Sequence, residues 1–383
     1  MQRRDFLKGL GAAGFVTLTP QLAWAAGPDY RRLLILVELK GGNDGLNTVI
    51  PFGDSGYASL RPRIGLRRED VLQLDERTAL HPALQPLMAL WQARELAIVQ
   101  SVGYPSPNLS HFRSIEIWDT ASNSEQYLHD GWLARAFAAN PPPATYVADG
   151  VLVGSSDLGP LAGNATRAIA LANTEQFLRS AKLAHAAEGQ GNAALNHLLK
   201  VETDVAYAAS RINSAYVFKT AFPGGVFGDA VKTGCQVLAS GSGVAALRLT
   251  LNGFDTHQNQ PGTHASLLKQ LAEGLLALKS ALVELGRWDD TLIMSYAEFG
   301  RRAKENQSNG TDHGTAAPHF VLGGRVRGGL YGEAPKLDRL DGNGNLPFAV
   351  DFRSLYATAL ERWWGASGSI LGGRFPAVEL LRT

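Results

Sequence analysis

The chain has 383 residues, of which 36 are Lys or Arg and 35 are Asp or Glu, giving a formal net charge of +1 at pH 7. This balance, without basic blocks, gives no support for nucleic-acid binding or for electrostatic attachment to a membrane. The only cysteine, Cys235, excludes an internal disulfide, and the length suffices for one large domain or two smaller ones.

Residues 1–26 are typical of an export signal. The paired residues Arg3-Arg4 precede an apolar run from Leu10 to Leu18, and Ala23-Trp24-Ala25 offers small residues to a signal peptidase. The arginine pair indicates the twin-arginine export machinery as a partner, and therefore a periplasmic or secreted protein. The apolar run is too short and too interrupted for a membrane anchor, and no second long one follows. We therefore expect no membrane contact after cleavage.

The mature part begins with a short apolar run, Leu33 to Leu39, which is typical of a strand buried on both faces of a parallel sheet. The run leads into Lys40-Gly-Gly-Asn-Asp44. Ligands of open α/β sheets collect beyond the carboxyl ends of strands, so Asp44 is a candidate metal ligand. A plain Asn-Asp-Gly turn explains the same residues equally well.

A helix is expected over His81–Arg94 and the next buried strand over Glu95–Gly103. The strand is followed by a loop and by a helix starting at His111, which places Ser110 at or near the N-cap. Unpaired backbone N–H groups at that position favour a serine nucleophile and an anionic ester. The alternative is that Ser110 only caps the helix.

Residues from about 130 to 240 differ in pattern from the flanking segments. Short strands are expected within Thr145–Gly154, and Ala- and Leu-rich helices within Thr174–Ile212. We interpret the whole segment as a helical insertion that carries no chemistry.

The core pattern resumes at Gly243–Gly253, a strand that ends close to Asp255 and His257. Side chains two residues apart in an extended segment point the same way, so this pair could share one metal ion. A long helix with one apolar face is expected over His264–Gly286.

The last strand-end groups follow the strand Asp290–Ala297. Glu298 could ligate a metal, orient a ligand or pair with Arg301. The dipeptide Asp312-His313 then places a carboxylate beside an imidazole, which suits a divalent cation with mixed oxygen and nitrogen ligands. His319 begins the next apolar run and is a further candidate ligand.

The order of these strand-end groups resembles the alkaline-phosphatase-like superfamily, and nearly the whole mature chain resembles the family called domain of unknown function 1501. The resemblance implies an α/β fold with a mostly parallel central sheet flanked by helices, a serine nucleophile, and one or two metals. It departs from the phosphatase pattern in the close spacing of Asp255 and His257, and no Cys replaces Ser110 as in sulfatases. The motifs that carry the family resemblance are Gly41–Asn47, Ser110-His111-Phe112, Gly253–His257, Ser295–Arg301, Thr311–Gly314 and His319–Gly324.

These observations predict a periplasmic metal-dependent hydrolase of phosphate or related anionic esters. The metal is a divalent ion, either zinc, manganese, magnesium or calcium. The alternative is a non-catalytic secreted binding or assembly protein with a structural metal, and a serine esterase is disfavoured because no G-x-S-x-G elbow occurs. The candidate catalytic residues are Ser110 and His111, and the candidate metal ligands are Asp44, Asp255, His257, Glu298, Asp312, His313 and His319.

Overall fold

The structure, a computed structural model, describes residues 27–172, 203–212 and 215–382. The expected export signal, residues 1–26, lies outside these residues, as does most of the expected helical stretch 174–212. In the described part of the chain, no helix is both long and apolar enough to cross a bilayer.

A nine-stranded sheet forms the centre of the molecule, in the order β11-β5-β10-β9-β1-β8-β6-β7, with β12 beside β5. Every pair is parallel except those of β10, which runs antiparallel to β5 and β9. The predicted mostly parallel sheet is therefore confirmed. The strands are β1 (Leu33–Lys40), β5 (Leu96–Gly103), β6 (Gly150–Val153), β7 (Ala168–Leu171), β8 (Ala246–Asn252), β9 (Thr291–Tyr296), β10 (Ala317–Leu322), β11 (Gly329–Tyr331) and β12 (Val350–Asp351).

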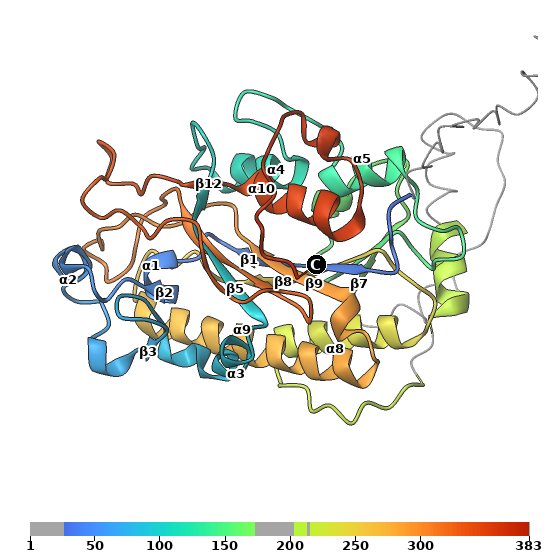
Figure 1. Ribbon diagram of the computed structural model, residues 1–383, viewed down its shortest axis with the longest axis horizontal. Coiled ribbons are helices and arrows are strands. Elements are labelled where there is room, and N and C mark those ends of the chain that lie inside the picture. The colour runs from blue at the N-terminus through green and yellow to red at the C-terminus, as the bar shows by residue number, and fades with distance from the viewer. Residues whose placement is uncertain (1–26, 173–202, 213–214, 383) are drawn as a thin grey trace, which may run out of the picture.

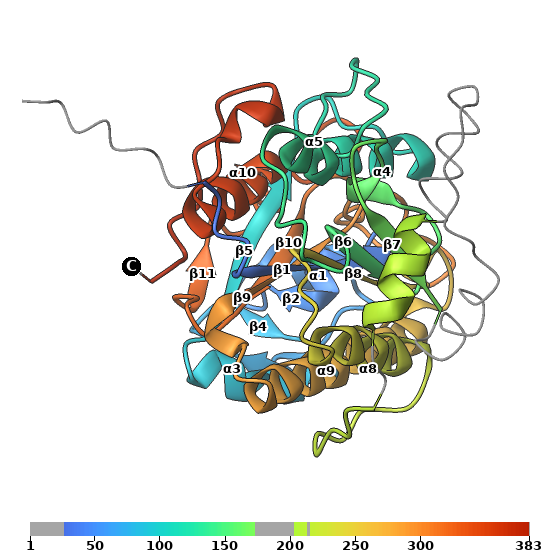
Figure 2. The same ribbon diagram turned by 90° about the vertical axis from the view of Figure 1, so that its right-hand side faces the viewer.

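Helices cover both faces of this sheet (Figures 1 and 2). Successive side chains of a strand point to opposite faces, so Ile35 and Val37 of β1 enter one apolar core and Leu34 and Leu36 enter the other. The continuous apolar run of β1 is thereby buried on both sides. The first core contains α3 (Met88–Gln92), α8 (Val226–Ala239) and α9 (Gln260–Glu284), and the second contains α4 (His111–Thr120), α5 (Trp132–Ala139) and α10 (Phe352–Ala357).

Smaller elements complete the chain. The expected helix over 81–94 is a 3-10 helix, Pro82–Leu87, continued by α3, and α10 runs on into a π-helix, Thr358–Trp364. Helix α9 begins four residues earlier than expected because Pro261, which is favoured in the first turn, follows Gln260. Beside the main sheet lie α1 (Gly45–Thr48), α2 (Ser55–Leu60) and a three-stranded sheet of β2 (Val49–Ile50), β3 (Leu72–Gln73) and β4 (Ala79–Leu80).

The expectation of a helical insertion over residues 130–240 needs correction in its described part. Strand β6 pairs with β8 and β7 pairs with β6, so this segment completes one side of the central sheet. Helix α8 packs against the same core. Apolar residues of these short strands, such as Val151 and Ile169, are buried because the sheet is covered on both faces.

Candidate metal centre

The carboxyl ends of four parallel strands place the candidate residues at one edge of the sheet. The loops after β1, β8 and β9 carry Gly41, Asp255 and Glu298, and the loop after β5 leads to His111 at the start of α4. His313 comes from the excursion between β9 and β10. This edge is where ligands of open α/β sheets bind.

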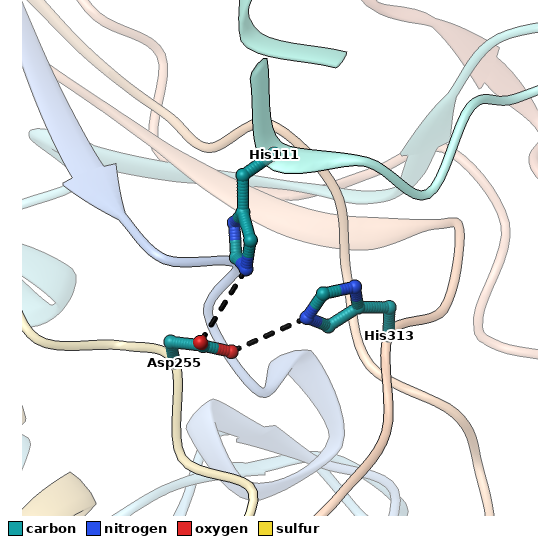
Figure 3. Close-up of side chains that lie close together, drawn as sticks. All are labelled: His111, Asp255 and His313. Atoms are coloured by element: carbon teal, nitrogen blue, oxygen red, sulfur yellow. Dashed lines mark hydrogen bonds and ion pairs between the residues drawn. The ribbon is translucent and has the colours of Figure 1, made fainter. Parts of the chain in front are cut away.

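Three of these side chains converge on one point (Figure 3). The Nε2 atom of His111 lies 3.4 Å from Oδ2 of Asp255, and Nε2 of His313 lies 3.3 Å from Oδ1. Their ligand atoms all lie within 4.8 Å of one another, so that one metal ion could contact all three. Nε2 of His111 is buried without a hydrogen-bond partner.

His313 presents a lone pair to this point. Its Nδ1 lies 2.8 Å from the backbone oxygen of Leu109, and a carbonyl can only accept, so Nδ1 carries the proton and Nε2 is an acceptor. Burial lowers the pKa of His313, which keeps the ring neutral. A lone pair facing a carboxylate oxygen of Asp255 at this distance is repulsive until a proton or a metal cation lies between them. The donor set therefore fits a metal ion.

His111 is held by Glu298. Its Nδ1 lies 2.8 Å from Oε1 of Glu298, and the same oxygen accepts the N–H of Gly41 at 2.9 Å. This hydrogen bond raises the pKa of His111, outweighing the opposite effect of burial. A carboxylate that accepts from one ring nitrogen while the other faces a metal is the usual support of a histidine ligand. Of the three roles expected for Glu298, the geometry corresponds to orienting a ligand.

Arg301 holds the carboxylate of Asp255 in place. The guanidinium is buried, with Nη2 2.6 Å from Oδ1 of Asp255 and Nε 2.7 Å from the carbonyl of Gly42. Burial would raise the pKa of Asp255, but the hydrogen bond and charge of Arg301 outweigh it and lower the pKa. Arg301 therefore pairs with Asp255, and not with Glu298 as one reading of the sequence proposed.

His257 and Asp312 lie at the edge of the cluster formed by His111, Asp255 and His313. Nε2 of His257 lies 2.9 Å from Nε2 of His313 and 3.0 Å from Oδ1 of Asp255. Its Nδ1 lies 3.6 Å from Oδ1 of Asp312, which accepts a hydrogen bond from Asn306. The neighbours Asp312 and His313 thus separate, with His313 in the cluster and Asp312 outside it.

Two expected ligands lie elsewhere. Asp44 is buried and its Oδ2 lies 2.6 Å from Nη1 of Arg61, so an arginine already neutralises it. His319 is buried in β10, where its ring lies 5.2 Å from that of Trp118 and burial lowers its pKa to about 3. Asp44 lies in the loop that follows β1, whereas His319 lies within β10 and its side chain packs against Trp118 in the core.

Ser110 is exposed at the N-cap position of α4, and its side chain makes no capping hydrogen bond. The plain capping role is therefore not observed. Its neighbours on both sides touch the cluster, through the carbonyl of Leu109 and the ring of His111. The hydroxyl is consequently free at the edge of the centre.

The sequence did not reveal Arg61 and Gln260, both of which bond to Asp44. Neither stands in a motif or at a strand end. Arg61 is the C-cap residue that follows α2, and Gln260 is the first residue of α9. A buried carboxylate always requires compensation, but only the folded chain identifies the partner.

The family described as Protein of unknown function (DUF1501) matches residues 31–372. The chain belongs to this family. Among curated proteins, none matches the sequence.

The solved structures that resemble this chain share little sequence identity with it. Ps i-CgsB has 12% identity and a TM-score of 0.41, covering 89% of this chain and 72% of its own. The alkaline phosphatase of the Antarctic bacterium TAB5 has 14% identity and a TM-score of 0.32, and the match covers 78% of this chain and 94% of the phosphatase. The C-terminal periplasmic domain of EcEptC from Escherichia coli, in complex with Zn, has 10% identity and a TM-score of 0.39. This match covers 78% of the present chain and 73% of the EcEptC chain. The function of this DUF1501 protein must be inferred from its own residues.

Proposed function

We propose that this DUF1501 protein is an exported, periplasmic metal-dependent hydrolase of phosphate or related anionic esters. The observation that carries the proposal is the cluster of His111, Asp255 and His313. It directs two imidazole nitrogens and a carboxylate to one point, and one of those nitrogens is buried without a partner. Most buried polar atoms have a hydrogen-bond partner, and three ligand atoms converging beside this unpaired one support an ion there.

The ion would be held by His111, Asp255 and His313, with His257 beside them. Nitrogen donors combined with one carboxylate favour zinc or manganese over calcium and magnesium, which prefer oxygen ligands. When bound, such a metal neutralises charge on the ester oxygens and lowers the pKa of a nearby hydroxyl or water.

Ser110 would serve as the nucleophile. Its exposed hydroxyl stands at the N-terminus of α4, whose backbone N–H groups favour an anionic group there. The Oγ atom would lose its proton to the departing alcohol and form a bond to the phosphorus, and water would then hydrolyse the phosphoserine, releasing phosphate and returning the Ser110 hydroxyl. Glu298 would act as a positioning residue, through His111.

The experiment loads purified protein with zinc or manganese and measures hydrolysis of aryl phosphate and sulfate esters. We expect turnover that a chelator abolishes, and loss of both metal and turnover in Asp255→Asn and His313→Ala. Ser110→Ala should keep the metal and the melting temperature but lose about a hundredfold or more in turnover. His129→Ala, at an exposed position outside the cluster, is the matched control. Activity that survives the chelator would contradict the proposal.

A binding or assembly protein with a structural metal is the second candidate, because Phe112, next to His111, is 89% exposed. Exposed aromatic side chains are frequent anchors at protein interfaces. Metal retention with no turnover on the whole ester panel would favour this function.

A further inference from the structure

Asp44, in the loop after β1, forms a buried ion pair with Arg61. Its side chain and that of Arg61 are both 0% exposed, and Nη1 of Arg61 lies 2.6 Å from Oδ2 of Asp44. The same oxygen accepts a hydrogen bond from the Gln260 side chain. Burial would raise the pKa of Asp44, but the charge and hydrogen bond of Arg61 outweigh it and keep the carboxylate ionised.

Arg61 is fixed in place by the surrounding backbone. Its Nε donates to the carbonyl of Ala303 at 2.9 Å, Nη2 to the carbonyl of Arg302 at 3.1 Å, and Nη1 to the side chain of Asn47 at 2.8 Å. A guanidinium is planar and always charged, so these bonds define its orientation. A divalent ion beside Asp44 would stand close to a buried positive charge that has no room to withdraw, which is strongly unfavourable.

Two buried imidazoles close to Asp44 each use one ring nitrogen in another contact. Nε2 of His264 lies 2.9 Å from the side-chain oxygen of Asn43, and Nδ1 of His81 accepts the N–H of Ala83. Burial lowers the pKa of both His264 and His81 to about 4, so neither adds charge here. Within the described residues, Asp44 belongs to no group of three potential ligands.

We infer that Arg61 supplies, as a permanent part of the protein, the positive charge that a second metal ion would otherwise supply beside Asp44, so that the chain binds one metal ion. The inference rests on the proposed function, because it takes the cluster around Asp255 as the place of that ion. Asp44 then organises the loop after β1 and is not a ligand, although it stands at a strand end.

The test counts zinc in the purified full chain by elemental analysis after loading and removal of free metal. We expect one ion per chain, and an affinity for zinc in Asp44→Asn within about threefold of the wild type. Asp255→Asn should lose the ion. Where Asp44→Asn does not fold, the neutral pair Asp44→Asn with Arg61→Gln replaces both charges and should also retain one ion.

Two ions per wild-type chain would overturn this inference alone, as would a folded Asp44→Asn or neutral-pair variant whose zinc affinity falls more than tenfold. No ion in the wild type would overturn the metal centre of the proposed function, and this inference with it. Thermal unfolding of each variant shows that the protein being counted is folded.

Discussion

At the scale of single residues, environment decides what each histidine does. His111 and His319 carry the same ring, but His111 shares a hydrogen bond with a buried carboxylate, whereas His319 packs against Trp118 and its Nδ1 is buried without a partner. The first pKa is raised and the second is lowered to about 3. His111 is therefore the more readily protonated of the two, and a metal would have to displace that proton, whereas His319 stays neutral inside the core.

We expect Glu298→Gln to weaken the metal centre without removing it. Losing the carboxylate charge should bring the pKa of His111 down in the metal-free protein, measured by NMR titration. Metal affinity should fall by about 10–100-fold, because the partner of a ligating histidine sets its orientation and basicity. Glu284→Gln, distant from the centre, should change neither quantity. An unchanged His111 pKa in Glu298→Gln would show that this carboxylate does not hold the ring.

Stability should fall on acidification, and His319 should contribute to this fall. The unfolded chain binds a proton near the ordinary value of 6.5, while the folded state resists protonation down to about 3. The unfolded state therefore binds more protons between these values, and the free energy of unfolding decreases as the pH falls from about 7. His319→Gln should reduce that decrease by about 3 kcal/mol at pH 4, measured by urea unfolding. His129→Gln should leave it unchanged, and equal pH slopes in all three proteins would contradict the assignment.

At the scale of elements, the loop after β1 connects the residues that follow β9 with Asp255, which follows β8. Gly41 donates its N–H to Glu298, and its φ of +116° suits glycine alone. The carbonyl of Gly42 accepts from Arg301, which in turn holds Asp255. A single turn of backbone thus positions side chains from two other strands.

Gly41→Ala should disturb this arrangement. A Cβ atom there would lie 2.4 Å from the backbone nitrogen of Asp255, and the backbone cannot yield without moving that residue. We expect a loss of about 1–3 kcal/mol in the free energy of unfolding, together with weaker metal binding. Gly262→Ala in α9 meets open space and should be neutral or stabilising. Equal stabilities of the two variants would contradict the close approach.

At the scale of the whole molecule, the centre ties the ends of β1, β5, β8 and β9 to one another. A ligand that binds only the folded state stabilises it, by about 2.7 kcal/mol at a free concentration one hundred times the dissociation constant. We therefore expect zinc to raise the melting temperature and a chelator to lower it again. Asp255→Asn should show no such response. A similar rise in that variant would place the stabilising ion elsewhere.

Much of the fold could be predicted because its signals are local. The continuous apolar runs of β1, β5, β8 and β9 identified strands buried on both faces, and the charged groups that follow them identified the edge where Asp255 and His313 meet. Periodicity within 130–240 was less informative, since four-residue strands such as β6 resemble any short apolar segment.

The sequence by itself determined which edge of the sheet carries the chemistry and which residue types gather there, because apolar patterning and strand ends are properties of neighbouring residues. Only the tertiary structure decided which of them cooperate. Asp44 meets Arg61, His319 turns into the core and His111 joins Asp255, because burial and charge pairing depend on residues brought together from distant parts of the chain.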